Sequence, residues 1–197
     1  MNRLNELEKM AKENGGVLLT SAIVAAGISK PTLADFVRKN EYERVGQGIY
    51  CSPECWKDDL YFLQLRCPKT VFSHETALFL LDMTDREPFQ YTVTAKTGYN
   101  PSHLSGDGVK VFTVKKELFD LGMTEAMTPF GHKVILYGPE RTVCDMIRSR
   151  NEMEIQSVQD ALKRYARRKD KNLHKLMEYA NLFHVDKRLN QYLEVLL

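Results

Sequence analysis

Residues 20–50 read TSAIVAAGISKPTLADFVRKNEYERVGQGIY, and this stretch decides the fold of the N-terminal part of the chain. Gly27 follows a short alanine-rich segment, and glycine can adopt the positive φ that a tight turn between two helices requires. Ser29 suits the N-cap of the next helix, and Pro31 falls in its first turn, where a missing N–H costs little. Two alternating strands around the turn Gly46-Gln47-Gly48 then predict a β-hairpin.

The residues before this stretch add a first helix. Residues 3–13 carry apolar side chains at helical spacing, and Asn14-Gly15-Gly16 provides a glycine stop. The stripe consists of Leu4, Leu7, Met10 and Ala11. Thr20 or Ser21 can cap the second helix, and we expect the small Ala25 and Ala26 where the second and third helices cross. This order of elements predicts a winged helix-turn-helix over residues 1–56.

The remainder of the chain, residues 57–197, has the pattern of a mixed α/β domain. Expected strands cover 70–72, 91–95, 109–114 and 132–137, and expected helices cover 58–65, 73–81, 139–148, 153–168, 172–182 and 186–197. The helix over 153–168 has one apolar stripe, made of Ile155, Val158, Leu162 and Tyr165. The predicted class is therefore α+β, with an N-terminal winged helix-turn-helix followed by a mixed α/β domain and a helical C-terminal tail.

The composition indicates the cellular compartment, and the compartment in turn indicates the state of the cysteines. The formal net charge is +2, no apolar run could span a bilayer, and the charged N-terminus does not resemble a signal peptide, so we expect a cytoplasmic protein with no membrane partner. Four cysteines occur, and in a reducing compartment we expect buried thiols rather than disulfides. The alternative is a zinc site of Cys51, Cys55, Cys67 and His74, which Pro53 and the lack of a second close pair disfavour.

Several strings resemble one known family over nearly the whole chain. In the N-terminal part they are Ala25-Ala26-Gly27-Ile28-Ser29 and Arg44-Val45-Gly46-Gln47-Gly48-Ile49-Tyr50. Further along they are Phe72-Ser73-His74-Glu75-Thr76-Ala77-Leu78 and Pro139-Glu140-Arg141-Thr142-Val143-Cys144-Asp145. These strings resemble the AbiEi family, the antitoxins and transcriptional regulators of bacterial abortive-infection (phage-defence) toxin–antitoxin operons.

The resemblance implies two roles. Members bind inverted repeats in their own promoter and repress the operon. They also counteract a nucleotidyltransferase-like toxin in the type IV manner, without forming a stable complex with it. The partners implied are therefore double-stranded promoter DNA and, functionally, the cognate toxin.

The third helix and the wing supply the candidate DNA-binding residues. In a winged helix the third helix enters the major groove, with its N-terminal residues nearest the base edges. Lys30 and Thr32 are the candidates for base contact. The remaining candidates lie at the helix start, near its end and on the wing, and they are Ser29, Arg38, Lys39, Arg44 and Gln47. Phosphate contacts by Arg38 and Lys39 would position the protein without specifying sequence.

A second basic segment lies at residues 163–171. Its candidate phosphate contacts are Lys163, Arg164, Arg167 and Arg168, which we expect to project outward from the helix over 153–168. The alternative is a solvated helix end whose cations suit the helix dipole.

No catalytic centre is expected. Ser73-His74-Glu75 contains triad residue types, but adjacent side chains diverge, so a helix cap with a partly buried histidine is the better interpretation. Arg141 and Asp145 are four apart and indicate a structural ion pair. No phosphate-cradling glycine loop or cofactor motif occurs. The rival hypotheses are a regulator whose C-terminal half binds a small effector, and an enzyme that modifies the toxin.

Overall fold

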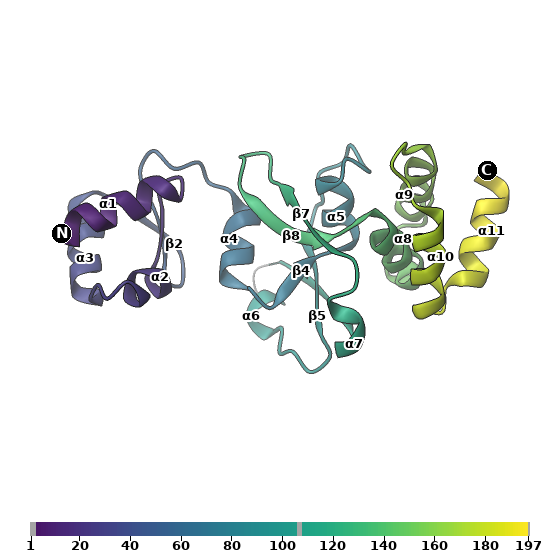
Figure 1. Ribbon diagram of the computed structural model, residues 1–197, viewed down its shortest axis with the longest axis horizontal. Helices are drawn as coiled ribbons and strands as arrows, with labels where there is room; N and C mark the ends of the chain where they lie inside the picture. Colours follow the sequence, from purple (N-terminus) through teal and green to yellow (C-terminus); the bar gives the residue numbers. More distant parts are fainter. Residues whose placement is uncertain (1–2, 106–107, 197) are drawn as a thin grey trace. The chain divides into compact units, whose positions relative to one another are not determined.

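The computed structural model describes residues 3–105 and 108–196, and the chain divides into two compact units, Met1–Cys67 and Pro68–Leu197 (Figure 1). The division falls after Cys67, later than the boundary expected after residue 56. Helix α4 (Asp59–Arg66) accounts for the difference, because its Phe62 belongs to the same buried cluster as Val17 and Ile49 of the N-terminal unit. None of the described helices is both long and apolar enough to cross a membrane.

The N-terminal unit contains helices and one small antiparallel sheet. In chain order its elements before α4 are α1 (Arg3–Glu13), β1 (Val17–Leu19), α2 (Thr20–Ala25), α3 (Lys30–Lys39), β2 (Glu43–Gly46) and β3 (Ile49–Cys51). The strand order is β1-β3-β2, so the β2–β3 hairpin expected from the glycine turn is present and β1 extends it. Every helix and strand expected before residue 52 is found.

The ends of α2 and α3 follow partly from the sequence. Gly27 has φ +78° between the two helices, and the Ser29 side chain caps α3, both as predicted. The N-cap of α2 is Leu19, without a side-chain cap, so neither Thr20 nor Ser21 has the expected role. Ala25 and Ala26 are exposed at the helix end rather than at the crossing. The apolar interior holds larger side chains instead, namely Leu7, Ile23, Ile28, Leu33 and Phe36, while Leu4 lies outside it.

The C-terminal unit is built on a five-stranded mixed sheet of order β6-β5-β4-β8-β7. The strands are β4 (Thr70–Phe72), β5 (Thr92–Lys96), β6 (Lys110–Val114), β7 (Met123–Met127) and β8 (Lys133–Tyr137). Strand β4 pairs antiparallel with β5 and parallel with β8 at the centre of the sheet. Strand β7, which the sequence analysis missed, pairs antiparallel with β8 and carries mixed polar and half-exposed side chains.

The helices of this unit are α5 (His74–Leu80), α6 (Ser102–Ser105), α7 (Lys116–Phe119), α8 (Pro139–Arg148), α9 (Ile155–Arg167), α10 (Leu173–Leu182) and α11 (Asp186–Leu196), with a 3-10 turn, η1, at Arg150–Glu152. Helix α8 packs against α5, α9, α10 and α11, and Figure 1 shows α8 to α11 gathered into one helical group. Val158, Leu162 and Tyr165 are buried as expected, whereas Ile155, the first residue of α9, is 67% exposed.

The cysteines differ from expectation at one pair. Cys51 and Cys55 form a disulfide, whereas we expected thiols. A turn explains it: the Cys55 amide donates to the Ser52 carbonyl at 3.0 Å, which brings the two cysteine Cα atoms to 5.7 Å, within reach of a disulfide. Cys67 and Cys144 are buried and take part in no disulfide, as predicted. Within residues 3–105 and 108–196, no group of three or more His, Cys, Asp or Glu could hold a metal ion.

Candidate nucleic-acid interface

Helix α3 presents a cationic outer face. Leu33 and Phe36 are buried in the core, and the side chains on the opposite side of the helix face solvent. Lys30, Arg38 and Lys39 are all exposed. Their spacing places Lys30 and Arg38 two helical turns apart on one side of the helix, with Lys39 further around.

The hydroxyl groups at the start of α3 are committed to the cap. Thr32 N donates to Ser29 Oγ at 3.3 Å, and the two hydroxyl oxygens lie 2.8 Å apart. Ser29 is exposed and Thr32 is half-buried. Lys30 is therefore the better placed of the two candidates for base contact, since its ammonium has no such local partner among the described residues.

One acidic side chain shares the outer face of α3. Arg38 Nη2 lies 2.8 Å from Asp35 Oδ1, and both side chains are more than 70% exposed. Such an exposed pair contributes little stability and can exchange for another partner. Arg38 can therefore turn from Asp35 to a phosphate at small cost, but Asp35 would repel phosphates that approach it directly.

The hairpin positions two further candidates. Arg44 Nε donates to the Gly46 carbonyl at 3.2 Å, at an irregularity in the pairing of β2 with β3. Gln47 is exposed at the tip, and Gly48 next to it has φ +72°. Both side chains are at the surface, and Arg44 keeps further N–H donors beyond the one that the carbonyl uses.

The candidates border two different grooves of the N-terminal unit. Lys30 and Gln47 line one groove, together with Thr20 and Ser21 at the start of α2. Thr32 and Lys39 line another, beside α1. The structure therefore brings the start of α3 and the tip of the hairpin together on one side, and it separates Thr32 and Lys39 from them.

The basic block of the C-terminal unit is largely paired. Arg164 forms a two-pronged ion pair with Asp85, one contact at 3.1 Å, and Lys163 lies 3.9 Å from Asp160. Arg167 is exposed and has no ion pair or hydrogen bond with another described residue. The pairing with Asp85 holds the pKa of that carboxyl below its usual range.

Arg168 departs from its expected placement. Helix α9 ends at Arg167, and Arg168 is extended, so it does not share a helix face with Arg164 and Arg167. Its guanidinium donates to the Leu81 carbonyl at 2.9 Å and pairs with both oxygens of Asp170 at 2.9 and 2.8 Å. Arg168 thus lies just past the end of α9 and ties this helix to the end of α5.

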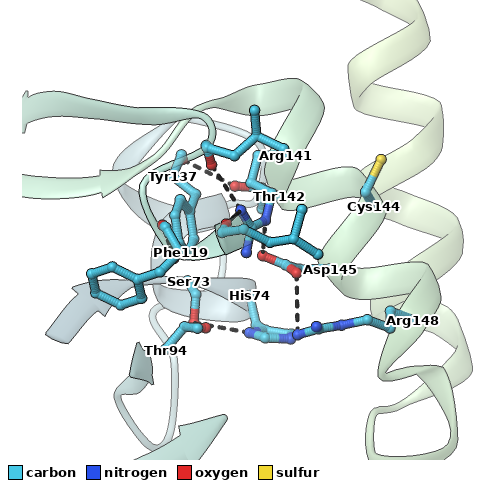
Figure 2. Close-up of polar contacts among 12 residues, drawn as sticks. Ser73, His74, Thr94, Phe119, Tyr137, Arg141, Thr142, Cys144, Asp145 and Arg148 are labelled. Atoms are coloured by element: carbon cyan, nitrogen blue, oxygen red, sulfur yellow. Dashed lines mark hydrogen bonds and ion pairs between the residues drawn. The ribbon is translucent and has the colours of Figure 1, made fainter. Parts of the chain in front are cut away.

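Ser73 and His74 of the Ser-His-Glu string form a buried polar network. His74 is fully buried, with Nδ1 2.9 Å from Ser73 Oγ and Nε2 3.1 Å from Ser149 Oγ, and its ring stacks on Phe112. Figure 2 shows Thr94 reaching this pair, where its hydroxyl donates to Ser73 Oγ at 2.8 Å. Burial, with the nearby arginines, lowers the pKa of His74 well below its usual value, so the imidazole is neutral. The expected partial burial was an underestimate, and the serine hydroxyl bonds the histidine instead of capping α5.

The Glu-Arg-Thr-x-x-Asp string builds a second buried network (Figure 2). Arg141 Nε lies 2.8 Å from Asp145 Oδ2 with both side chains fully buried, which confirms the predicted structural pair. One Nη of Arg141 donates to the carbonyls of Leu118 and Leu121 at 2.8 and 2.7 Å. Its guanidinium also stacks between the rings of Tyr137 and Phe183. This arginine holds α7, α8 and α10 together.

Residues 5–53 match a family model described as "Transcriptional regulator, AbiEi antitoxin", which confirms the family suggested by the sequence strings. The N-terminal unit is therefore similar to that of AbiEi antitoxin regulators.

A solved structure shares the fold over most of the chain. The RV2827C protein from Mycobacterium tuberculosis matches with a TM-score of 0.57 at 14% identity, covering 96% of this chain and 78% of its own. No curated protein sequence matches the chain.

Proposed function

We propose that the chain is the autorepressor and antitoxin of an abortive-infection toxin–antitoxin operon, and that residues 3–51 act as a winged helix-turn-helix on inverted repeats in its own promoter. Helix α3 is the reading helix and the β2–β3 hairpin is the wing. The observation that carries this proposal is the groove shared by Lys30 and Gln47, because a reading helix and a wing must face the same side to meet one duplex.

Within this proposal the side chains divide by task. Lys30, at the start of α3, reaches base edges, and a lysine suits the acceptor atoms of guanine. Arg38, Lys39 and Arg44 contact phosphates, and Gln47 contacts the DNA backbone beside the wing. Ser29 and Thr32 fix the helix start.

The experiment that tests the reading helix compares operator and random DNA in gel shifts. Lys30→Ala should lower the preference for operator by about 1–3 kcal/mol, the value of one good base contact. Lys12→Ala, which removes an exposed lysine from α1, is the matched control and should keep the preference. If Lys30→Ala discriminates as well as the wild type, α3 is not the reading helix.

We propose that residues 68–197 carry the antitoxin role, against a nucleotidyltransferase-like toxin and without a stable complex. The family supports a regulator and antitoxin rather than an enzyme. In support, the Ser73–His74 pair is fully buried, so its hydroxyl cannot meet a substrate. A full chain with Lys30→Ala, supplied from an unregulated promoter, should still rescue growth when the toxin is expressed. Failure to rescue by this folded variant would contradict the division of labour.

A further inference from the structure

A cationic groove lies between α9 and α11 of the C-terminal unit. Its volume is about 530 Å³, within the range of small-molecule sites. Three basic side chains border it, and each comes from a different element: Arg150 from η1, Lys163 from α9 and Arg188 from α11. Among the described residues that line the groove, none is acidic.

Local structure pairs these three cations only weakly. Arg150 donates one long hydrogen bond of 3.5 Å to the Ile147 carbonyl, and the carboxylate that Lys163 meets, that of Asp160, is 3.9 Å away. Arg188 is exposed in the first turn of α11, where the helix dipole disfavours a positive charge. An anion in the groove would relieve both the mutual repulsion and the unfavourable dipole interaction.

The other lining residues are suited to a flat ring. Tyr192 is half-buried and packs against the main apolar core, to which the buried Leu162 belongs, so its ring offers an apolar surface. Two exposed amides, Gln159 from α9 and Gln191 from α11, stand beside this surface. An amide can donate and accept hydrogen bonds at once, as the edge of a nucleobase requires.

We propose that this groove binds a nucleoside phosphate. The phosphates meet Arg150, Lys163 and Arg188, and the base lies against Tyr192 with its edge toward the glutamines. Inorganic phosphate would use only the cations, and an acidic peptide would leave the ring surface unused. The proposal goes beyond promoter binding and toxin neutralisation, and it depends on neither, since every lining residue is in the C-terminal unit.

Two kinds of ligand carry a nucleoside phosphate: a free nucleotide, or a nucleic-acid strand that places one of its nucleotides in the groove. Calorimetric titration of the full chain with ATP, GTP, guanosine, pyrophosphate and a single-stranded tetranucleotide separates them. We expect a nucleotide or the tetranucleotide to bind more tightly than guanosine or pyrophosphate. Tighter binding of the free nucleotide than of the tetranucleotide indicates a free nucleotide as the ligand, and the reverse order indicates a nucleic-acid strand.

Two charge-matched variants test the placement. Arg188→Gln should weaken nucleotide binding about ten-fold, the loss expected for one charge-assisted contact. Lys187→Gln removes the adjacent exposed cation of the same turn, which does not line the groove, and should bind like the wild type. Thermal melting of both variants checks that they are folded.

Three results would overturn the proposal. One is no binding of ATP, GTP or the tetranucleotide at millimolar concentration. Another is pyrophosphate binding as tightly as the nucleotide, which would leave the base without a role. The last is an equal loss in Lys187→Gln and Arg188→Gln, which would indicate attraction to overall positive charge rather than this groove.

Discussion

The hydroxyl oxygens of Ser29 and Thr32 lie 2.8 Å apart at the start of α3, and Ser29 Oγ also accepts a hydrogen bond from the Thr32 amide. This pair joins the cap of the reading helix to the surface that we propose for base contact. Because the Thr32 hydroxyl pairs with the Ser29 cap, we propose Lys30 rather than Thr32 for base contact at this end of the helix. Sequence alone treated Lys30 and Thr32 as equivalent candidates.

Removing the cap should destabilise the N-terminal unit. Ser29→Ala should lower its free energy of unfolding by about 1 kcal/mol, the usual value of an N-cap hydrogen bond. Urea denaturation monitored by circular dichroism measures this change. Ser21→Ala, within α2 where the serine caps nothing, is the control and should change stability by less than about 0.5 kcal/mol. Equal effects of the two variants would contradict the capping role.

Salt dependence of operator binding should single out Arg167 within the basic block. Arg164 and Arg168 already pair with Asp85 and Asp170, whereas Arg167 is exposed without a partner among the described residues. Arg167→Ala should flatten the slope of log K against log salt by about 0.9, the value of one phosphate contact. Arg164→Ala should change the slope less. An unchanged slope in Arg167→Ala would mean that the block does not touch DNA.

The buried imidazole of His74 should make stability depend on pH. Burial lowers the pKa of His74 in the folded state below the unfolded value of about 6.5, so below pH 6.5 the unfolded chain binds more protons. The contribution is full above pH 6.5 and is lost as the pH falls toward the folded pKa. At pH 5.5 the loss relative to pH 7.5 should be at most about 1.4 kcal/mol.

The variant His74→Asn tests this assignment, because asparagine tolerates the positive φ of 49° found at this position. Its free energy of unfolding should fall less between pH 7.5 and 5.5 than that of the wild type. His184→Asn is the matched control, since His184 has φ 57° but an exposed side chain. A wild-type pH dependence in His74→Asn would assign the effect to other groups.

The disulfide between Cys51 and Cys55 should stabilise the N-terminal unit modestly. It closes a loop of only a few residues, for which chain entropy predicts about 2 kcal/mol. Reduction by dithiothreitol should lower the free energy of unfolding by this amount, and Cys55→Ser should do the same and abolish the response to reductant. Alkylation with mass detection reports the thiol state. A reductant effect that persists in Cys55→Ser would contradict the assignment.

Local patterns determined most of the N-terminal unit. Three features act only on neighbours a few residues away, so their effect can be predicted from the sequence: the glycine at position 27, the serine cap at 29 and the alternation around Gly46-Gln47-Gly48. The same holds for the ion pair of Arg141 and Asp145, whose four-residue spacing places both side chains on one face of a helix.

Contacts between residues that are distant in the sequence were determined only by the tertiary structure. Nothing near Arg164 in the sequence points to Asp85, and nothing near His74 points to Ser149, yet the folded chain brings each of these two pairs into contact. Strand β7 lacks a strong alternation because it is an edge strand with one neighbour, so its pairing with β8 defines it. The sequence by itself determined the N-terminal helix–hairpin order and the family. The fold decided which cations remain unpaired, because an ion pair depends on where two segments meet in space.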